Sequence, residues 1–217
     1  MDEKEGNLKS LRQKIRKDGK LYTLKADVNR FFFPKEYCKF EDALKSKQKH
    51  TIHFLLNTGC RINEARNVSV SDVDFVNKRM VIRKVKRKAK KKETRGKIRT
   101  IPISSKFVRY LNRYVNNNNL TETDTFRLLS TPAINIAMKK TAEKIGLSNP
   151  EDFSAHTIRK TLEVWLMSLG VRDIPLTAHF GHDIKTAASH YVSPDVFSNE
   201  EKMHMRDIIG DLYWGAR

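Results

Sequence analysis

Apolar residues recur along most of this chain at the spacing of one face of an α-helix. The apolar run Phe31–Phe33 marks the start of a globular region, and residues 36–56 predict two helices, the second ending at Thr58-Gly59. Gly146 and Gly170 follow two later helical patterns, as glycine commonly does at a helix C-terminus. Those later helices are predicted over residues 107–115, 132–145 and 158–169.

A different pattern separates these helices into two groups. Residues 80–85 and 98–103 are rich in β-forming residues, with Pro102 placed as at a sheet edge, and a lysine-rich run lies between them. This arrangement predicts a long β-hairpin with a basic tip, and residues 68–75 add a shorter strand-like stretch. The expected fold class is therefore mainly α with a small antiparallel β-sheet.

The two ends of the chain differ from this middle region. Residues 1–30 hold few apolar residues and six basic ones within 9–20, so we expect a basic arm or a loosely packed helix rather than a domain. At the other end, the Ser-x-x-Glu pattern at 198–201 has the spacing of a capping box before an amphipathic helix. The prediction is one domain over residues 31–197, followed by a C-terminal amphipathic helix within 198–217.

The charge of the chain points to the class of its partner. The 217 residues include 43 Lys or Arg and 25 Asp or Glu, a formal net charge of +18. Eleven basic residues and one acid lie between Arg83 and Arg99, inside the predicted hairpin. Like charges this close repel one another, so a surface that needs only solvation would not concentrate them. The charge therefore favours nucleic acid as the partner, ahead of an anionic membrane surface.

Composition excludes several other classes of protein. No segment reaches the roughly 20 consecutive apolar residues of a membrane span, and the polar start of the chain is not a signal peptide. Cys38 and Cys60 form no Cys-x-x-Cys pair and are interpreted as reduced thiols of an intracellular protein. The expected location is cytoplasmic, in association with nucleic acid and without a membrane partner.

Three short segments carry residues suited to phosphate chemistry. The first is Thr58-Gly59-Cys60-Arg61-Ile62-Asn63-Glu64, the second is His156-Thr157-Ile158-Arg159, and the third is Gly181-His182, with Tyr191 nine residues after that histidine. Each alone has an ordinary explanation, since an arginine after a helix end or a His-x-x-Arg pair usually lies on a solvated face. Their order on a strongly basic chain makes them informative together.

In this order the segments resemble the catalytic domain of the tyrosine recombinases, the phage-integrase and Xer-like family. The family pattern is TGxRxxE, a lysine in a β-hairpin, HxxR, GH and a tyrosine nine residues further on. The resemblance covers about residues 31–197, so this region is expected to be the catalytic domain. It implies an enzyme that cleaves and rejoins DNA through a 3′-phosphotyrosyl link, with no metal and no cofactor.

The resemblance assigns the two central roles, and elementary chemistry explains the residue types. Tyr191 is the expected nucleophile, although its phenol is weak until it is positioned and deprotonated. Arg61 and Arg159 would grip both non-bridging oxygens of the phosphate, because guanidinium groups stay charged at any working pH. Such fixed positive charge is usually the largest contribution to this kind of catalysis.

The same resemblance assigns the supporting roles. His156 would take the tyrosine proton or hold a phosphate oxygen, and His182 would hydrogen-bond the same phosphate. Glu64, three residues beyond Arg61, would orient that arginine or a neighbouring catalytic group.

The general acid is the role that this sequence leaves open. Counting from Arg61 places it near Lys86, whereas counting back from the second strand points nearer Lys92, because this hairpin is longer than the compact family version. Lys86 is the favoured candidate, and Lys84, Lys88, Lys90, Lys91 and Lys97 also remain. The hairpin residues expected to contact DNA phosphates are Lys84, Arg87, Lys88, Lys90, Lys91, Lys92, Arg95 and Lys97.

Three functions remain open at this point. The favoured one is site-specific recombination or integration, as carried out by mobile genetic elements, because the set of site residues is complete and the interval from His182 to Tyr191 matches. The second is a related nicking-closing enzyme, either a type IB topoisomerase or a telomere-resolving enzyme. The third is a DNA-binding relative that does not cleave.

The resemblance also implies the partners. They are double-stranded DNA and further copies of the chain, four on paired DNA sites, with accessory DNA-bending proteins as additional candidates. The C-terminal helix within 198–217 is then a candidate for exchange between subunits. About 30 residues precede the predicted catalytic domain, fewer than the separate DNA-clamping domain of many members. We therefore expect a minimal recombinase, or a clamp supplied by a partner or a missing segment.

Overall fold

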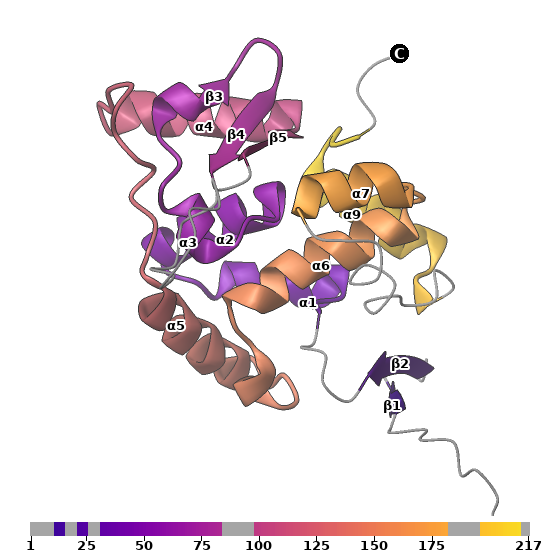
Figure 1. The fold of residues 1–217 in the computed structure, drawn as a ribbon. Helices are drawn as coiled ribbons and strands as arrows, with labels where there is room; N and C mark the ends of the chain where they lie inside the picture. The colour runs from indigo at the N-terminus through magenta and orange to yellow at the C-terminus, as the bar shows by residue number, and fades with distance from the viewer. Residues whose placement is uncertain (1–10, 16–20, 26–30, 84–97, 182–195, 214–217) are drawn as a thin grey trace, which may run out of the picture.

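Helix α6 (Ala155–Ser168) is the buried centre of the fold. Almost every side chain along it is buried, including Leu162 and Trp165, as expected for a helix that is surrounded by other elements. Helix α2 (Ser46–Thr58) packs directly against it (Figure 1). The two segments that carry the first and second sequence motifs therefore lie side by side in the core.

The structure is a computed structural model that describes residues 11–15, 21–25, 31–83, 98–181 and 196–213. Within these ranges, the helices not yet named are α1 (Pro34–Asp42), α3 (Ile62–Ala65), α4 (Ser105–Asn117), α5 (Thr131–Lys144), α7 (Asp173–Phe180) and α9 (Asn199–Ile209). Two short 3-10 turns, η1 (Val70–Asp72) and η2 (Pro150–Asp152), complete the helical elements of the described residues. The predicted helices over 107–115, 132–145 and 158–169 correspond to α4, α5 and α6.

The aromatic run before α1 anchors the start of the domain. Phe31, Phe32 and Phe33 are all buried, and the Phe32 main chain is hydrogen-bonded on both sides. Its N–H donates to the Thr161 hydroxyl at 2.9 Å, and the Trp165 indole donates to its carbonyl at 2.9 Å. These bonds fix the segment to two successive turns of α6.

A three-stranded antiparallel sheet in the order β3-β4-β5 lies against this helical body. Strands β4 (Arg79–Arg83) and β5 (Ile98–Pro102) pair from Arg79 with Pro102 to Arg83 with Ile98, which confirms the predicted hairpin strands. Only two residues of the stretch 68–75 form a strand, β3 (Val73–Asp74). The predicted longer strand is wrong because the Asp72 carboxylate accepts the Ser69 N–H and hydroxyl, which turns the chain into η1.

The N-terminal region contains two short strands. Within the described residues, Leu11–Ile15 forms β1 and Leu21–Lys25 forms β2, and the two strands pair antiparallel from Leu11 with Lys25 to Ile15 with Leu21. Of the two expectations for residues 1–30, the loosely packed helix is therefore wrong in these ten residues, and the basic arm stays a prediction. The sequence of these two segments includes Ile, Tyr and Thr, residue types with a high β propensity.

The tail closes back onto the same domain. Ser198 and Glu201 form the predicted capping box, in which each main-chain N–H donates to the other side chain, at 2.9 and 3.2 Å. Met205, Ile209 and Leu212 are buried in the core of their own chain. In this single chain the apolar face of α9 is therefore already covered, and exchange of this helix between subunits stays a prediction.

Candidate active site

The C-terminal turn of α2 sets the geometry of the first motif. Gly59 ends the helix in the left-handed conformation, with φ of 59°, and its N–H donates to the Leu55 carbonyl at 2.8 Å. A Cβ at this position would lie 2.6 Å from the Phe180 ring and 3.0 Å from Leu162. Glycine is therefore required here both by backbone conformation and by space. The turn brings Arg61 to the N-terminus of α3.

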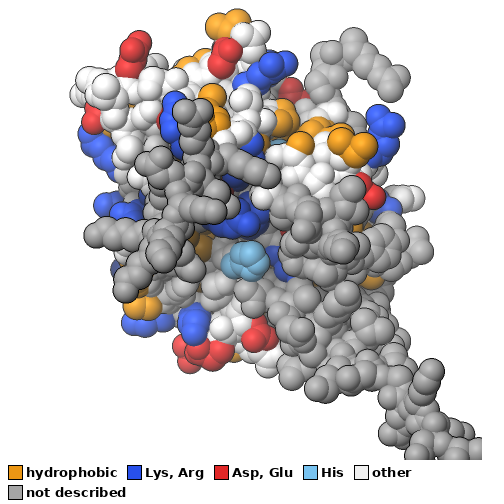
Figure 2. All heavy atoms as spheres, viewed as in Figure 1, with side chains coloured by type: hydrophobic (Ala, Val, Ile, Leu, Met, Phe, Trp, Pro, Cys, Tyr) orange, Lys and Arg blue, Asp and Glu red, His pale blue; other side chains and the backbone are white. Residues whose placement is uncertain are grey.

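A pocket of about 160 Å³ opens beside this turn. Its lining brings together three of the predicted site residues, Arg61, His156 and Arg159, from the starts of α3 and α6. Figure 2 shows a histidine and several Lys or Arg side chains gathered at the hollow centre of one face. The other residues of the lining are Cys60, Ile62, Thr131, Asn135, Ser154 and Ala155.

Arg61 presents the more accessible positive charge of the pocket. Its side chain is 49% exposed, and its Nη1 donates to the Glu64 carboxylate at 3.3 Å. The second Glu64 oxygen accepts the Arg61 main-chain N–H at 3.1 Å, so the glutamate also closes the first turn of α3. Glu64 thus contacts both the side chain and the main chain of Arg61, and its orienting role stays a prediction.

Arg159 is the buried charge of the same pocket. Its Nη1 donates to the Gly59 carbonyl and its Nη2 to the Phe180 carbonyl, both at 2.6 Å. Burial, together with the nearby charge of Arg61, lowers the pKa of Arg159 to about 10, which still leaves the guanidinium charged at neutral pH. A guanidinium has five N–H groups, and these two bonds use two of them. Arg159 can therefore hold two turns of the chain and still donate to an anion.

His156 lies in the first turn of α6, where it is exposed, and the preceding residue fixes that turn. The Ala155 N–H donates to the Asn135 side-chain oxygen at 2.9 Å, which satisfies one of the free donors at the start of α6. This bond leaves the Asn135 amide N–H groups as donors beside the pocket. The sequence pattern did not identify Asn135, because its role depends on α5 meeting α6.

A second histidine near the site is buried. The Nε2 of His179 lies 3.0 Å from the Thr58 carbonyl, and its Nδ1 has no hydrogen-bond partner among the described residues. Burial, reinforced by the charges of Arg99 and Arg159, lowers the pKa of His179 to about 3. It is therefore neutral at physiological pH and joins α7 to the end of α2 as a structural group.

Sequence comparison identifies the family. Residues 28–196 match the phage integrase family over most of the chain. The chain belongs to the phage integrase family. The tyrosine recombinase XerA of Saccharolobus solfataricus is 27% identical to it over 155 residues, which are 70% of this chain and 48% of that relative. This phage integrase chain thus spans about half the length of the relative.

Solved structures share the fold of this phage integrase domain. A crystal structure of XerA recombinase matches with a TM-score of 0.58 at 17% identity, covering 82% of this chain and 64% of that one. The Tn1549 transposon integrase, in complex with transposon right end DNA, matches with a TM-score of 0.62 at 18% identity, covering 85% and 68%. The mainly helical fold with a small antiparallel sheet is that of the family's catalytic domain.

Several predicted site residues lie outside the described residues of this integrase chain. They are the general-acid candidate Lys86, together with His182 and Tyr191. The hairpin residues predicted to contact DNA lie outside them too, namely Lys84, Arg87, Lys88, Lys90, Lys91, Lys92, Arg95 and Lys97. The described strands and helices end at their borders: β4 ends at Arg83, β5 begins at Ile98, and Gly181 follows α7.

The described part of this integrase bears on two other chemistries, that of a metal site and that of a reactive thiol. There, no group of three or more His, Cys, Asp or Glu side chains is arranged to hold a metal ion. Burial raises the pKa of the Cys60 thiol to about 11, so the pocket is lined by a thiol and not by a nucleophilic thiolate. Within the same ranges, no helix is both long and apolar enough to cross a membrane.

Proposed function

We propose that this chain is a site-specific DNA recombinase that cleaves and rejoins DNA through a 3′-phosphotyrosyl intermediate. The observation that carries the proposal is the pocket in which Arg61, His156 and Arg159 meet, in a chain of net charge +18. Two guanidinium groups at one small pocket suit a phosphodiester, because planar cations fork onto pairs of oxygens. Membership of the phage integrase family supports the same reaction.

The reaction follows from these residue types. The Tyr191 hydroxyl oxygen attacks the phosphorus, the bond from phosphorus to the 5′ oxygen breaks, and a 3′-phosphotyrosine forms. His156 takes the tyrosine proton or holds a phosphate oxygen, and His182 hydrogen-bonds the same phosphate. Rejoining is the reverse step with a different 5′ hydroxyl, so the energy of the broken bond is kept in the phosphotyrosyl link.

Lys86 is the proposed acid that protonates the departing 5′ oxygen, with Lys92 as the main alternative. A lysine acid needs a pKa lowered toward neutrality, which the many neighbouring cations of the hairpin would favour. The other hairpin cations are proposed to contact DNA phosphates, each adding about one unit to the salt dependence of binding.

Arg61 and Arg159 are proposed to stabilise the phosphate charge in different ways. Arg61 is half exposed and its guanidinium is held on one side by Glu64, so it can reach an incoming phosphate. Arg159 is buried and holds the carbonyls of two turns, so its charge is fixed in place before DNA arrives. Charge that needs no rearrangement stabilises a transition state most effectively.

Assembly on DNA is a further part of the proposal. Four copies on paired sites would exchange strands through a junction, with accessory DNA-bending proteins as additional partners. In the single chain, α9 buries Met205 and Ile209 in its own core. Exchange of α9 between copies would transfer these same contacts to a neighbour, as in a domain swap.

The proposal is tested by trapping. The protein is incubated with a library of nicked duplexes in which the short fragment beyond the nick diffuses away after cleavage, and DNA attached covalently to protein is recovered and sequenced. A recombinase yields adducts enriched in one sequence, whereas a chain that only binds DNA yields none. Holliday-junction formation by two recovered sites then separates recombination from the nicking-closing alternative, which would relax supercoiled plasmid without forming junctions.

A further inference from the structure

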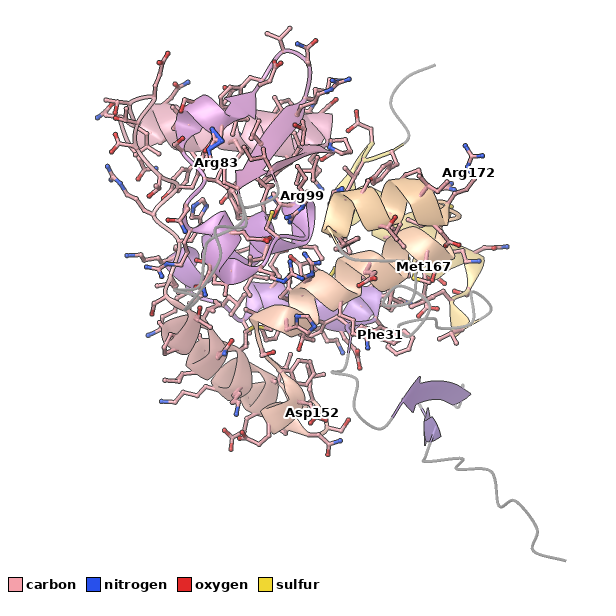
Figure 3. All side chains as sticks on the ribbon, viewed as in Figure 1. Phe31, Arg83, Arg99, Asp152, Met167 and Arg172 are labelled. Carbon is pink, nitrogen blue, oxygen red and sulfur yellow. The ribbon has the colours of Figure 1, made fainter. Side chains whose placement is uncertain are left out.

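Arg99 is a basic residue that faces inward from the hairpin. It is the second residue of β5, on the same face as buried Ile101, and its side chain is only 13% exposed. Its guanidinium forks onto the Glu64 carboxylate, with Nη2 to Oε2 at 2.8 Å and Nη1 to Oε1 at 3.3 Å. Figure 3 shows Arg99 between the sheet and α7. Its charge is thus directed into the protein and not onto a solvated surface.

The third contact of Arg99 holds it from the side of α7. Its Nε donates to the His179 carbonyl in the last turn of that helix, at 2.9 Å. Gly181, with φ of 64°, lies so close that a Cβ there would be 3.2 Å from the Arg99 Cδ. The side chain is therefore clamped between the end of α7 and α3, which leaves its guanidinium one orientation.

Glu64 connects this clamp to the pocket. Only 4% of its side chain is exposed, and it shares its oxygens between Arg99 and the main chain and side chain of Arg61. Burial alone would raise the pKa of Glu64, but the hydrogen bonds and charges of Arg99 and Arg61 outweigh it and hold that pKa below its ordinary value. The carboxylate is ionised, and a buried carboxylate is stable only when a cation pairs with it.

We propose that Arg99 is a positioning residue that acts on Arg61 through Glu64. It does not line the pocket itself. By taking up two of the carboxylate's lone-pair positions, it leaves Glu64 one hydrogen bond for the Arg61 guanidinium and sets the direction of that bond. Without Arg99, both oxygens of Glu64 would be available to the Arg61 guanidinium. The stronger ion pair would then hold Arg61 away from the phosphate. The inference rests on the proposed function, because its readout is cleavage.

The test is the rate of single-turnover adduct formation on nicked DNA by Arg99→Gln, beside Arg83→Gln as a matched control. Arg83 is an arginine of the same sheet that pairs with a buried carboxylate, that of Asp72, at 2.6 Å. Loss of Arg99 should slow adduct formation about 100-fold, the effect expected of a small misplacement of a reacting group, with DNA affinity changed less than about threefold. Arg83→Gln should change the rate less than about threefold.

The positioning role also predicts that the effects of Arg99 and Arg61 on the rate of adduct formation are not additive. In an Arg61→Gln background, Arg99→Gln should slow adduct formation by less than about threefold further, because the residue it acts through is gone. A full 100-fold loss in both backgrounds, or a loss confined to DNA affinity, would overturn the proposal.

Arg99→Lys keeps the positive charge but cannot donate two parallel hydrogen bonds to Glu64. Its rate of adduct formation is measured if Arg99→Gln does not fold. A wild-type rate in Arg99→Lys would also overturn the proposal, and a slow rate with wild-type DNA affinity supports it. The wild-type chain is measured in the same assay. Absence of its adduct would count against the proposed function, whereas a wild-type adduct with an unaffected Arg99→Gln would count against Arg99 alone.

Discussion

The Nη1 of Arg159 donates a 2.6 Å hydrogen bond to the carbonyl of Gly59, one hundred residues earlier in the chain. The same guanidinium reaches the Phe180 carbonyl, the residue before Gly181. One side chain thus fixes the second motif to the glycine turn of the first and to the last residue of α7. The buried arginine of His-x-x-Arg therefore links α6 to two turns of the chain, in addition to the phosphate-binding role proposed for it.

Arg159→Lys should fail in both respects. A lysine is a point charge that cannot bridge two carbonyls and also face a phosphate, so cleavage should fall by about 100-fold or more. The lost bonds to buried carbonyls should lower the free energy of unfolding by about 1–3 kcal/mol. Single-turnover cleavage and urea unfolding measure the two effects, and Arg172→Lys, at the exposed residue just before α7, is the matched control. Cleavage close to wild type in Arg159→Lys would reduce this arginine to a structural role.

Gly59→Ala should be strongly destabilising. The left-handed backbone costs about 1–2 kcal/mol for a residue with a Cβ, and the 2.6 Å approach to Phe180 adds an overpacking cost of about 1–3 kcal/mol. Gly146 is the natural control, because its φ is 72° but a Cβ there would meet no atom within 4 Å. Gly146→Ala should therefore show the backbone cost alone. Equal losses for the two variants in urea unfolding would refute the role given to the Phe180 contact.

Two buried histidines predict a loss of stability in acid. Burial lowers the pKa of His50 to about 4 and that of His179 to about 3, both below the unfolded value of about 6.5. The unfolded chain therefore binds more protons as the pH falls from about 6.5 toward 4, and each histidine should remove about 2 kcal/mol by about pH 4.5. His179→Gln keeps a donor for Thr58 and should lose less stability than wild type between neutral pH and that acid pH. An unchanged loss in His179→Gln and His50→Gln would show that other groups cause the acid sensitivity.

The hairpin acid can be located with a modified substrate. If Lys86 protonates the departing 5′ oxygen, Lys86→Ala should cleave normal DNA poorly but recover on DNA whose 5′ bridging oxygen is sulfur, a leaving group that needs no proton. Lys92→Ala is the matched control from the same run. If rescue by sulfur appears in Lys92→Ala and not in Lys86→Ala, the acid is Lys92 and the count from Arg61 was misleading.

The sequence predicts well those features that are local. Helix ends at Gly59 and Gly146, the capping box of Ser198 and Glu201, and the strands on either side of the lysine run depend on neighbours in the chain. The family and the site motifs are also legible, because catalysis requires particular residue types at short spacings.

Features that depend on partners distant in sequence were not predicted. Arg99 was counted only as one end of a basic run, because its Glu64 partner is 35 residues away and nothing local distinguishes a buried arginine from a solvated one. His179 received no role, since its burial depends on the contact of α7 with the end of α2. The one local signal for Arg99 is its alternation with Ile101, which places both on the inner face of β5.

The central claim is that Tyr191 forms a covalent bond with DNA, and peptide mapping of the trapped adduct tests it most directly. The wild-type adduct is digested with protease and nuclease, and the modified peptide is identified by mass spectrometry. The account predicts a nucleotide on Tyr191, an adduct absent from Tyr191→Phe, and DNA affinity unchanged in that variant, because only the phenolic oxygen is lost. An adduct that persists in Tyr191→Phe, or one that maps to Tyr110, Tyr114 or Tyr213, would contradict it.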